Sequence, residues 1–287
     1  MTIQQLLKTA PVTTLLLVCF IGLYILQVLS GMDANNPSTE ALLKWGANAL
    51  PFTMGFEPWR LVSSAFLHIG LMHLLFNGFA MYFFGQIAEP MFGSSKFLAL
   101  FLLAAIGGNL LNNYITWQGI VEGSGQPGIS AGASGGIMGI GAALLIAALF
   151  KISVNGMVLN LKSLMLIMGI NLVYGFAVPG IDNAGHIGGA VTGLVIALAI
   201  GIAHRQRMSA QLASIPSYQT DYTQYSADGN INLNSSFDKQ NNHHSTSKPA
   251  MIWQLLPWLV MLVISIGFFL WWQDIHNQIL QVLAAEQ

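Results

Sequence analysis

The sequence predicts an all-α polytopic membrane protein, and three observations carry that prediction. Of its 287 residues, 54% are hydrophobic and only 7% are charged, whereas soluble domains carry about 25% charged residues. The apolar residues gather in runs of the roughly 20 residues that a helix needs to cross a bilayer. Lys and Arg fall mostly on one side of these runs, as in other membrane proteins. A formal net charge of −1 gives no reason to expect a nucleic-acid partner.

Seven apolar runs are long enough to be membrane spans. They cover about 12–30, 66–87, 97–116, 133–150, 163–180, 184–203 and 251–272. The first run is too long for a signal peptide, and no small-x-small cleavage site follows it, so we expect it to be retained. The single cysteine, Cys19, lies inside this run, which argues against a disulfide framework.

The orientation follows from the positive charges. With the N-terminus in the cytoplasm, eight Lys and Arg residues fall inside and only two outside, Lys44 and Arg60. The inner eight are Lys8, Lys96, Lys151, Lys162, Arg205, Arg207, Lys239 and Lys248. Seven spans put the C-terminus outside the cytoplasm. We therefore expect a multi-pass protein of the lipid bilayer, in the inner (plasma) membrane of a bacterium.

The chain divides into three predicted parts. Residues 1–204 form a six-span core, whose long first outer loop, about 31–65, is rich in aromatic residues and is expected to lie in the membrane interface. Residues 205–249 are rich in Ser, Asn, Gln and Asp, which is typical of a disordered cytoplasmic linker. Residues 250–287 form a seventh helix with a short extracytoplasmic tail. The predicted architecture is six spans plus one.

Polar and ionisable residues inside a membrane are costly, so those within the apolar runs are functional candidates. They gather on the second, fourth and sixth runs. The second contains His68, His73 and Asn77, the fourth opens with Gly132-Ala133-Ser134-Gly135, and the sixth opens with Gly185-His186-Ile187-Gly188-Gly189.

Depth in the membrane tests whether these candidates can meet. All three runs pass from outside to inside. The next charged residue follows each candidate by 16 to 19 residues: Glu89 after His73, Lys151 after Ser134, and Arg205 after His186. At about 1.5 Å per helical residue, these separations correspond to roughly 24–29 Å. The three side chains are therefore expected at one level, just below the outer surface.

This combination of residues predicts nucleophilic catalysis. A serine hydroxyl becomes a good nucleophile when an adjacent base takes its proton, and histidine is the natural base near neutral pH. His73, Asn77 and the Ser134 backbone N–H can stabilise an oxyanion. Small residues let helices approach closely in lipid. Gly189, Gly193 and Ala197 share the face of His186, and Gly141 and Ala148 fall near that of Ser134.

Together these residues resemble the rhomboid family of intramembrane serine proteases. Four motifs in order carry the resemblance: Trp59-Arg60; His68, His73 and Asn77; Gly132, Ser134 and Gly135; and His186 with Gly189 and Gly193. Glu89, at the end of the second span, stands where the family often has an acid. The resemblance covers about residues 1–204, and the rest looks like the six-plus-one form of some members.

The resemblance implies a rhomboid-like six-helix bundle with the fourth helix central, plus one C-terminal transmembrane helix. It implies a Ser134–His186 dyad without a third carboxylate, an oxyanion site of His73, Asn77 and the Ser134 amide, and no cofactor or metal. The implied activity is a serine endopeptidase that cleaves single-span membrane proteins near their extracytoplasmic end. The fifth span and the loop at about 177–182 look like a gate and cap. Many members have a Tyr where this chain has Met138, which supports an imidazole less rigidly.

Structural roles compete with these functional ones. Ser134 could be a packing residue, His186 a structural histidine, and His73 and Asn77 a bonded pair that joins helices. His68 lies about 140° from His73 around an ideal helix, so we expect it to tie the first loop to the second helix. Trp59 and Arg60 are expected to be interface anchors, with Gly132, Gly135, Glu89, Gly189 and Gly193 as structural support. Asp182 suggests a helix cap rather than a triad acid.

Three other functions remain as alternatives. A metalloprotease is disfavoured because the chain has no H-E-x-x-H motif and no Asp or Glu between residues 61 and 88. A transporter would show inverted repeats and midplane acids, and we find neither. A catalytically inactive relative that binds membrane proteins would typically lack the nucleophile or the base, whereas this chain keeps both. The sequence leaves open the substrate and the oligomeric state.

Overall fold

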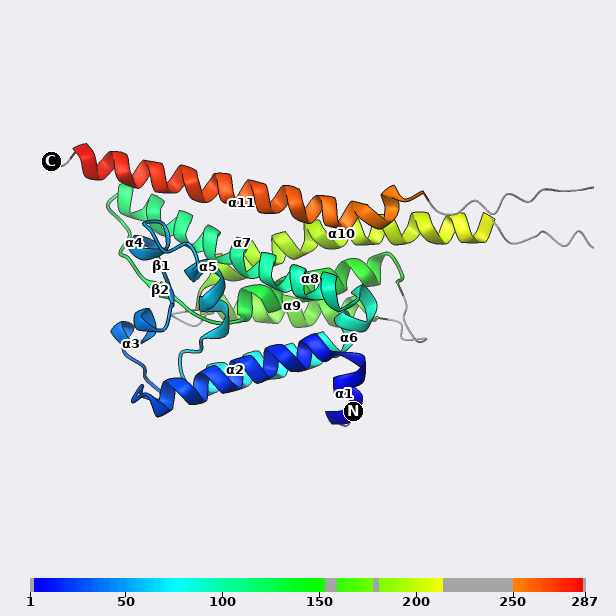
Figure 1. The fold of residues 1–287 in the computed structure, drawn as a ribbon, viewed down its shortest axis with the longest axis horizontal. Helices are drawn as coiled ribbons and strands as arrows, with labels where there is room; N and C mark the ends of the chain where they lie inside the picture. The colour runs from blue at the N-terminus through cyan, green and yellow to red at the C-terminus, as the bar shows by residue number, and fades with distance from the viewer. Residues whose placement is uncertain (1–2, 153–158, 178–180, 214–249, 286–287) are drawn as a thin grey trace, which may run out of the picture.

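The computed structural model describes residues 3–152, 159–177, 181–213 and 250–285, and within them it is an all-α membrane protein. Five helices are long and apolar enough to span a bilayer: α2 (Pro11–Leu29), α6 (Leu71–Phe92), α7 (Ser94–Val121), α10 (Asn183–Ala213) and α11 (Ile252–Ala285). Two shorter apolar helices, α8 (Ser134–Leu149) and α9 (Leu161–Ala177), complete the set. These seven helices correspond in order to the seven predicted runs (Figure 1).

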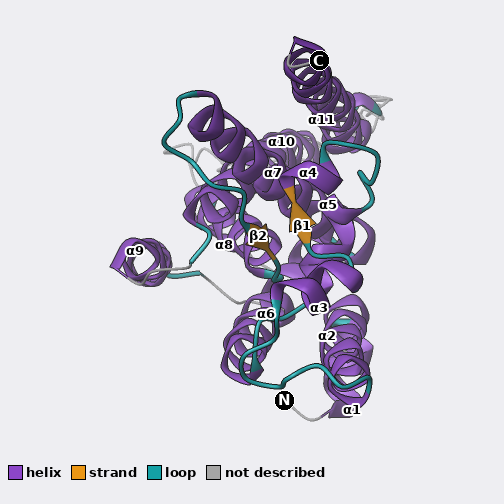
Figure 2. Ribbon diagram, turned by 90° about the vertical axis from the view of Figure 1, so that its left-hand side faces the viewer, coloured by secondary structure: helices purple, strands orange, loops and turns teal. Residues whose placement is uncertain are grey.

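Helix α8 lies at the centre of the bundle. It packs against α6, α7, α9 and α10, and most of its residues are buried, in keeping with its small side chains and its short length. Helix α9 stands at the edge of the bundle, and α11 lies along α10 and α7 (Figure 2). The large apolar side chains of α2 and α11 that stay exposed, such as Leu15, Val18, Val263 and Phe269, suit a lipid-facing surface.

The first outer loop is built from short elements. It contains α3 (Thr39–Lys44), α4 (Leu50–Thr53), α5 (Arg60–Ser63) and the 3₁₀ turn η1 (Ser64–Phe66). Strand β1 (Asn48–Ala49) pairs antiparallel with β2 (Ile129–Ser130), so the loop is joined to the segment that leads into α8. A short helix, α1 (Ile3–Thr9), precedes α2 at the opposite end of the bundle (Figure 1).

Arg60 organises this loop from within, so the expectation that it is an interface anchor is wrong. Its guanidinium is buried and pairs with Glu57 at 2.7 Å. It also donates to the carbonyls of Leu43 (2.7 Å) and Ala47 (3.0 Å), and it lies 4.8 Å from the ring of Trp59. A buried cation is stable only with such partners. Trp59 itself is half exposed, as an interfacial residue would be.

Glu89 is fully buried near the end of α6, where it caps the start of α2. Its carboxylate accepts from the backbone N–H groups of Val12 (2.9 Å) and Thr13 (2.7 Å), the Thr13 hydroxyl (2.8 Å) and the Ser94 hydroxyl (2.6 Å). Helix N-termini carry unsatisfied N–H groups and favour negative charge. Glu89 therefore joins α2, α6 and the beginning of α7.

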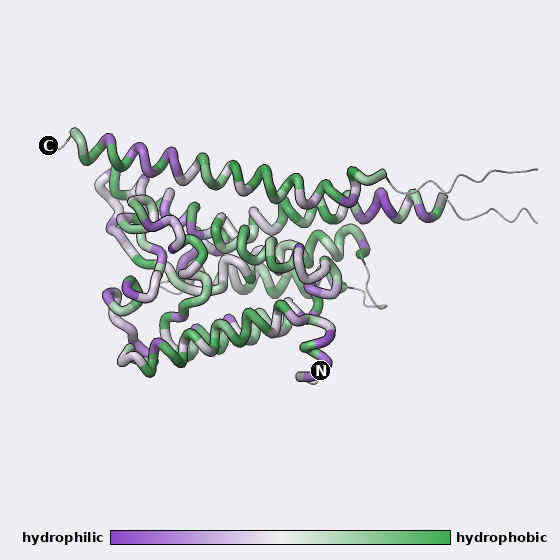
Figure 3. Tube along the Cα trace, in the orientation of Figure 1, coloured by the Kyte–Doolittle hydropathy of each residue, from purple (hydrophilic) through white to green (hydrophobic). Residues whose placement is uncertain are grey.

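Three boundaries differ from the prediction. Helix α6 begins at Leu71 rather than about 66, because residues 60–66 form α5 and η1. Helix α10 continues to Ala213, so the first part of the predicted 205–249 linker is helical, and its hydrophilic end is visible in Figure 3. The rest of that linker, 214–249, lies outside the described residues. Helix α11 runs to Ala285, so the predicted tail after the seventh span is helical instead.

The seventh helix also makes specific contacts with the core. The indole N–H of Trp272 donates to the Thr53 carbonyl at 2.8 Å, and Nδ1 of His276 lies 2.6 Å from the Met54 carbonyl oxygen. The indole N–H of Trp117 on α7 donates to Gln278 at 2.9 Å. These bonds all lie at the end of the bundle that holds the first outer loop, so α11 is bonded to α4 and α7.

Candidate active site

Ser134 is the first residue of α8 and is half buried. The residue before it, Ala133, has no side-chain acceptor that could cap the helix. The backbone N–H groups of the first turn are therefore left without a capping side chain, and the helix dipole adds positive character there. The hydroxyl of Ser134 thus stands beside donors that favour a developing negative charge.

His186 lies in the first turn of α10 and is also half buried. Asp182 caps this helix, because its carboxylate accepts the Gly185 N–H at 2.7 Å. The same carboxylate accepts from Asn112 (2.9 Å) and from the Ser130 hydroxyl (2.7 Å). The interpretation of Asp182 as a helix cap is confirmed, and its partners fix the start of the helix that carries His186.

Helices α8 and α10 meet through a glycine seam, formed by Gly135 and Gly139 on α8 and by Gly185, Gly189 and Gly193 on α10. A methyl group added to Gly189 would overlap the Gly135 carbonyl, with its carbon only 2.6 Å from the Gly135 carbonyl carbon. A methyl group on Gly193 would likewise overlap the Gly139 backbone, with its carbon only 2.5 Å from the Gly139 carbonyl carbon. Only glycine permits this backbone contact, and Ser134 and His186 are the immediate neighbours of Gly135 and Gly185.

The seam corrects one detail of the sequence interpretation. Gly141 does not face α10, because a methyl group there would meet the sulfur of Met168 on α9 and, at 3.4 Å, the ring of Phe84 on α6. The small residues of α8 that meet α10 are Gly135, next to Ser134, and Gly139, one turn further along the helix. Met138, between them, is buried in the same helix.

His73 and Asn77 lie one turn apart on α6 and face the segment that enters α8. Gly132 has a φ of +145°, which favours glycine, and a Cβ there would come within 2.6 Å of the His73 ring and 3.7 Å of the Asn77 amide nitrogen. The backbone N–H of Gly132 donates to the Ser64 carbonyl at 2.9 Å. His73 and Asn77 are therefore held against the backbone two residues before Ser134.

The hydrogen bonds of His73 indicate which ring nitrogen carries its proton. Nδ1 accepts from the backbone N–H of Ile69 at 3.2 Å, so in the neutral ring the proton is on Nε2. Nε2 is the nitrogen that lies toward Gly132. The ring also lies close enough to His186 for the two to interact electrostatically. The Asn77 amide donates one hydrogen to the His73 carbonyl at 3.1 Å and keeps a second for another acceptor.

His68 stands behind His73 rather than beside Ser134. Its ring is fully buried and contacts the rings of Phe20 on α2 and His73 on α6, with centroids 5.3 Å and 5.4 Å away. This position joins α2, the end of the first loop and α6.

A polar network missed by the sequence analysis lies behind the site. Asn109 on α7 donates to the Leu61 carbonyl (2.9 Å) and the Ser64 hydroxyl (2.8 Å), and Asn112 and Ser130 bond to Asp182. These bonds join the first loop, α7, β2 and the start of α10. The sequence could have indicated this network, because burying asparagines of the third apolar run in a membrane costs free energy, as burying the histidines of the second run does.

The donor types of this site suit acyl transfer rather than metal binding. Among the residues that the structure describes, no group of three or more His, Cys, Asp and Glu residues is placed to hold a metal ion. The groups that it does bring together are a hydroxyl at a helix start, an imidazole on the adjoining helix, and the imidazole and amide donors of α6. Groups of these types can act as a nucleophile, a base and anion-stabilising donors.

Comparisons with known proteins identify the family of the chain. The model of the rhomboid domain matches residues 55–203. The chain is 38% identical to the rhomboid protease GluP of Bacillus subtilis over 184 residues, which are 64% of this chain and 34% of that protein. It is 30% identical to the rhomboid protease AarA of Providencia stuartii over 220 residues, covering 71% of this chain and 77% of that protein.

A third relative is RHOMBOID-like protein 6, mitochondrial, of Arabidopsis thaliana, which is 33% identical over 162 residues. That match covers 56% of this chain and 50% of the plant protein. The chain therefore spans about a third of the Bacillus protein and half of the Arabidopsis protein, but most of the Providencia protein.

Proposed function

The chain belongs to the rhomboid family, and from that premise we propose that it is an intramembrane serine endopeptidase with Ser134 as nucleophile and His186 as general base. The observation that supports this most directly is the glycine seam, because it brings together the two helix starts that carry these residues. The three named relatives and this chain are rhomboid proteins, and two of them are named as proteases.

In the proposed reaction, the Ser134 oxygen attacks the carbonyl carbon of the scissile peptide while His186 takes the hydroxyl proton. The tetrahedral intermediate then collapses, and His186 returns the proton to the departing amine. An acyl-enzyme remains on Ser134. Water, deprotonated by His186, hydrolyses this ester and releases the new carboxylate. The dyad needs no further acid, and Asp182 is already engaged as a helix cap.

We propose that three kinds of donor stabilise the negative charge of the intermediate: Nε2–H of His73, the free hydrogen of the Asn77 amide, and the N–H groups at the start of α8. Their position against Gly132 and the absence of a capping side chain at Ala133 support this role. Each such donor typically contributes about 10²–10³ in rate.

The proposed substrates are single-span membrane proteins cut near the extracytoplasmic end of their helix. Helix α9, which lies at the edge of the bundle, is the proposed side of entry (Figure 2). Part of the loop proposed as its cap, residues 178–180, lies outside the described residues. The multi-pass protein is proposed to lie in a bacterial inner membrane with its N-terminus in the cytoplasm, an orientation that the charge bias supports.

Cleavage of a model single-span substrate by the purified full-length protein tests the proposal. We expect Ser134→Ala and His186→Ala to abolish cleavage while the protein stays folded. Ser265→Ala is the matched control, because the Ser265 hydroxyl on α11 donates to the Met261 carbonyl of its own helix and lies outside the site. Equal cleavage by wild type and Ser134→Ala would end the claim. No cleavage by wild type of any substrate that it binds would favour the inactive, membrane-protein-binding relative.

A further inference from the structure

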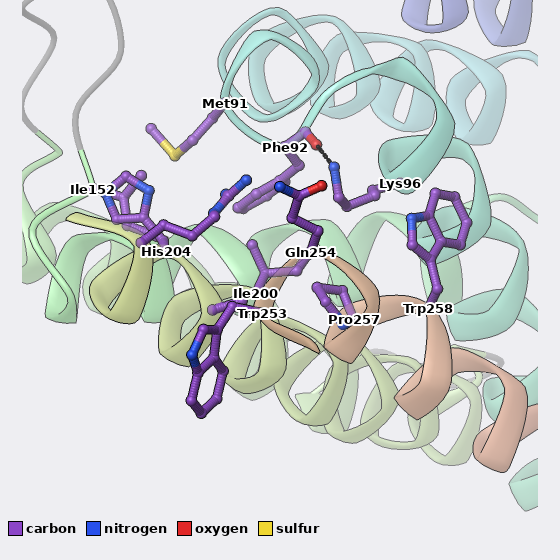
Figure 4. Close-up of a pocket in the computed structure, with 12 residues that line it drawn as sticks. Met91, Phe92, Lys96, Ile152, Ile200, His204, Trp253, Gln254, Pro257 and Trp258 are labelled. Carbon is purple, nitrogen blue, oxygen red and sulfur yellow. Dashed lines mark hydrogen bonds between the residues drawn. The ribbon is translucent and has the colours of Figure 1, made fainter. Parts of the chain in front are cut away.

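A cavity lies at the end of the bundle remote from Ser134. It has a volume of about 280 Å³ and lies between the junction of α6 and α7, the later turns of α10 and the first turns of α11. Its walls include Lys96, His204, Arg207, Trp253, Gln254 and Trp258 (Figure 4). A single water needs only about 10–15 Å³ of such space, so this cavity admits a group of many atoms.

The charges of this cavity are all of one sign. Lys96 and His204 both interact electrostatically with Arg207, and the described residues that line the cavity include no Asp or Glu. The one salt bridge among the described parts of the chain joins Arg60 to Glu57, at the other end of the bundle. Glu89, on the same turn of α6 as the lining residues, is committed to the start of α2 and to Ser94.

Lys96 and Arg207 also have hydrogen-bond donors without an observed acceptor in the described part of the chain. Lys96 gives one bond, to the Phe92 carbonyl at 3.1 Å, although an ammonium has three donors. Nε of Arg207 is buried and has no hydrogen-bond partner within the described residues. A buried, unpartnered guanidinium nitrogen is costly, so this cavity calls for an acceptor that carries negative charge.

The rest of the lining indicates the kind of anion. Phe92, Ile152, Ile200, Ala203 and Pro257 form buried apolar walls. Trp253 and Trp258 stand on either side of Pro257, and Trp258 is 41% exposed (Figure 4). Tryptophan favours the membrane interface, and the charge bias assigns this end to the cytoplasmic face. An anion with attached apolar chains matches this surface better than a soluble anion does.

We propose that this cavity binds the phosphate headgroup of an anionic phospholipid, which joins the six-helix core to the seventh helix. The phosphate oxygens accept from Lys96 and Arg207, while the acyl chains lie along the apolar walls between α10 and α11. Basic pockets between helices on the cytoplasmic side commonly recognise such lipids. This proposal does not depend on the catalytic one, because its residues lie at the opposite end of α10.

Native mass spectrometry of the full-length protein, titrated with dioleoyl-phosphatidylglycerol, tests the proposal. We expect saturable binding that dioleoyl-phosphatidylcholine does not match. Each cation near an anionic surface contributes enough that Lys96→Gln with Arg207→Gln should weaken binding about thirtyfold. The matched control is Lys162→Gln with Arg205→Gln, which removes two positive charges from exposed positions outside the cavity and should leave this site unchanged.

A second variant covers the case in which the double substitution misfolds. Gln254 is exposed and lines the cavity, so Gln254→Glu adds a negative charge with almost no change of shape. We expect it to weaken phosphatidylglycerol binding about tenfold, while Gln273→Glu, at an exposed site elsewhere on α11, does not. Equal binding of the two lipids, or equal losses in variants and controls, would overturn the proposal. Displacement of the lipid by millimolar inorganic phosphate would assign the cavity to a soluble phosphate instead.

Discussion

Helix α8 has two very different neighbours, α10 and α9. Against α10 it makes backbone contact through the glycine seam, with no side chain between Gly135 and Gly189. Against α9 it makes a side-chain contact, in which the sulfur of Met168 fills the space over Gly141. Most of the remaining described side chains of α9 are exposed, including Met165, Leu166, Ile170 and Val173.

The difference assigns separate tasks to the two sides of α8. A backbone contact between glycines cannot shift without breaking, so it holds the proposed nucleophile and base in register. A side-chain contact such as that of the flexible Met168 thioether can rearrange at lower cost. The bundle is therefore rigid where the proposed chemistry occurs and loosely attached where a substrate helix is proposed to enter.

The largest effect that tests this comparison comes from filling the seam. Gly189→Val would force α8 and α10 apart, and we expect a loss of at least about 3 kcal/mol in stability, because the neighbouring atoms are backbone. Cleavage should fall about 100-fold even in the protein that folds, since small displacements of catalytic groups have that cost. Thermal unfolding and a substrate-cleavage assay measure the two effects.

The control for that substitution lies on α9. Gly169 has no atom within 4 Å of the position that a Cβ would take, so Gly169→Val should change neither stability nor cleavage appreciably. If the two glycine substitutions had the same effect, the proposed contrast between the two sides of α8 would be wrong.

Removal of the cap on α10 should have the next largest effect. Asp182→Ala deletes three accepted hydrogen bonds, so we expect a loss of about 2–4 kcal/mol in the free energy of unfolding. Asp182→Asn keeps an acceptor for the Gly185 N–H, so its free energy of unfolding should lie between those of the wild type and Asp182→Ala. If Asp182 were instead a triad acid, Asp182→Asn would leave stability intact and lower turnover about 10⁴-fold.

Deletion of the seventh helix should be milder. A chain that ends at Ala213 loses the bonds of Trp272, His276 and Gln278, which should cost about 1 kcal/mol each. Because α11 packs on α10 and α7, on the side away from α9, we expect the active site to remain formed. Thermal unfolding should show the lower stability, and cleavage should persist. Loss of the folded core would show that α11 is integral to it.

A substitution in α9 should have the smallest effect on the protein. Met168→Ala weakens its contact with Gly141, so the edge of the bundle should open more readily and cleavage should rise a few-fold. Met165→Ala is the control, because this residue is 58% exposed on the same helix. Initial rates at low substrate concentration measure both. A fall in rate with Met168→Ala alone would mean that α9 supports the site.

Comparison with the sequence analysis shows which features hydropathy and motif spacing could predict. The seven apolar runs predicted the seven apolar helices, and the motifs predicted that Ser134 and His186 lie at the openings of their helices. These features are local, since a run of apolar residues or a short motif is contained in one segment.

The features that were missed depend on residues far apart in the chain. Nothing near Glu89 in the sequence indicates that it caps α2, and nothing near Arg60 indicates that it would be buried by the carbonyls of Leu43 and Ala47. The network around Asn109 likewise joins four elements. The glycine seam was anticipated on α10, but on α8 the prediction named Gly141 and Ala148 where the structure has Gly135 and Gly139. An ideal helical wheel does not show which side of a buried helix meets which neighbour.

The most direct test of the catalytic pair is labelling of the intact protein with a fluorophosphonate, followed by mass spectrometry of the modified peptide. We expect the label on Ser134, unchanged in Ser265→Ala and reduced by orders of magnitude in His186→Ala, because the base activates the hydroxyl. A folded protein that is not labelled at Ser134, or that is labelled equally with and without His186, would contradict the proposed dyad.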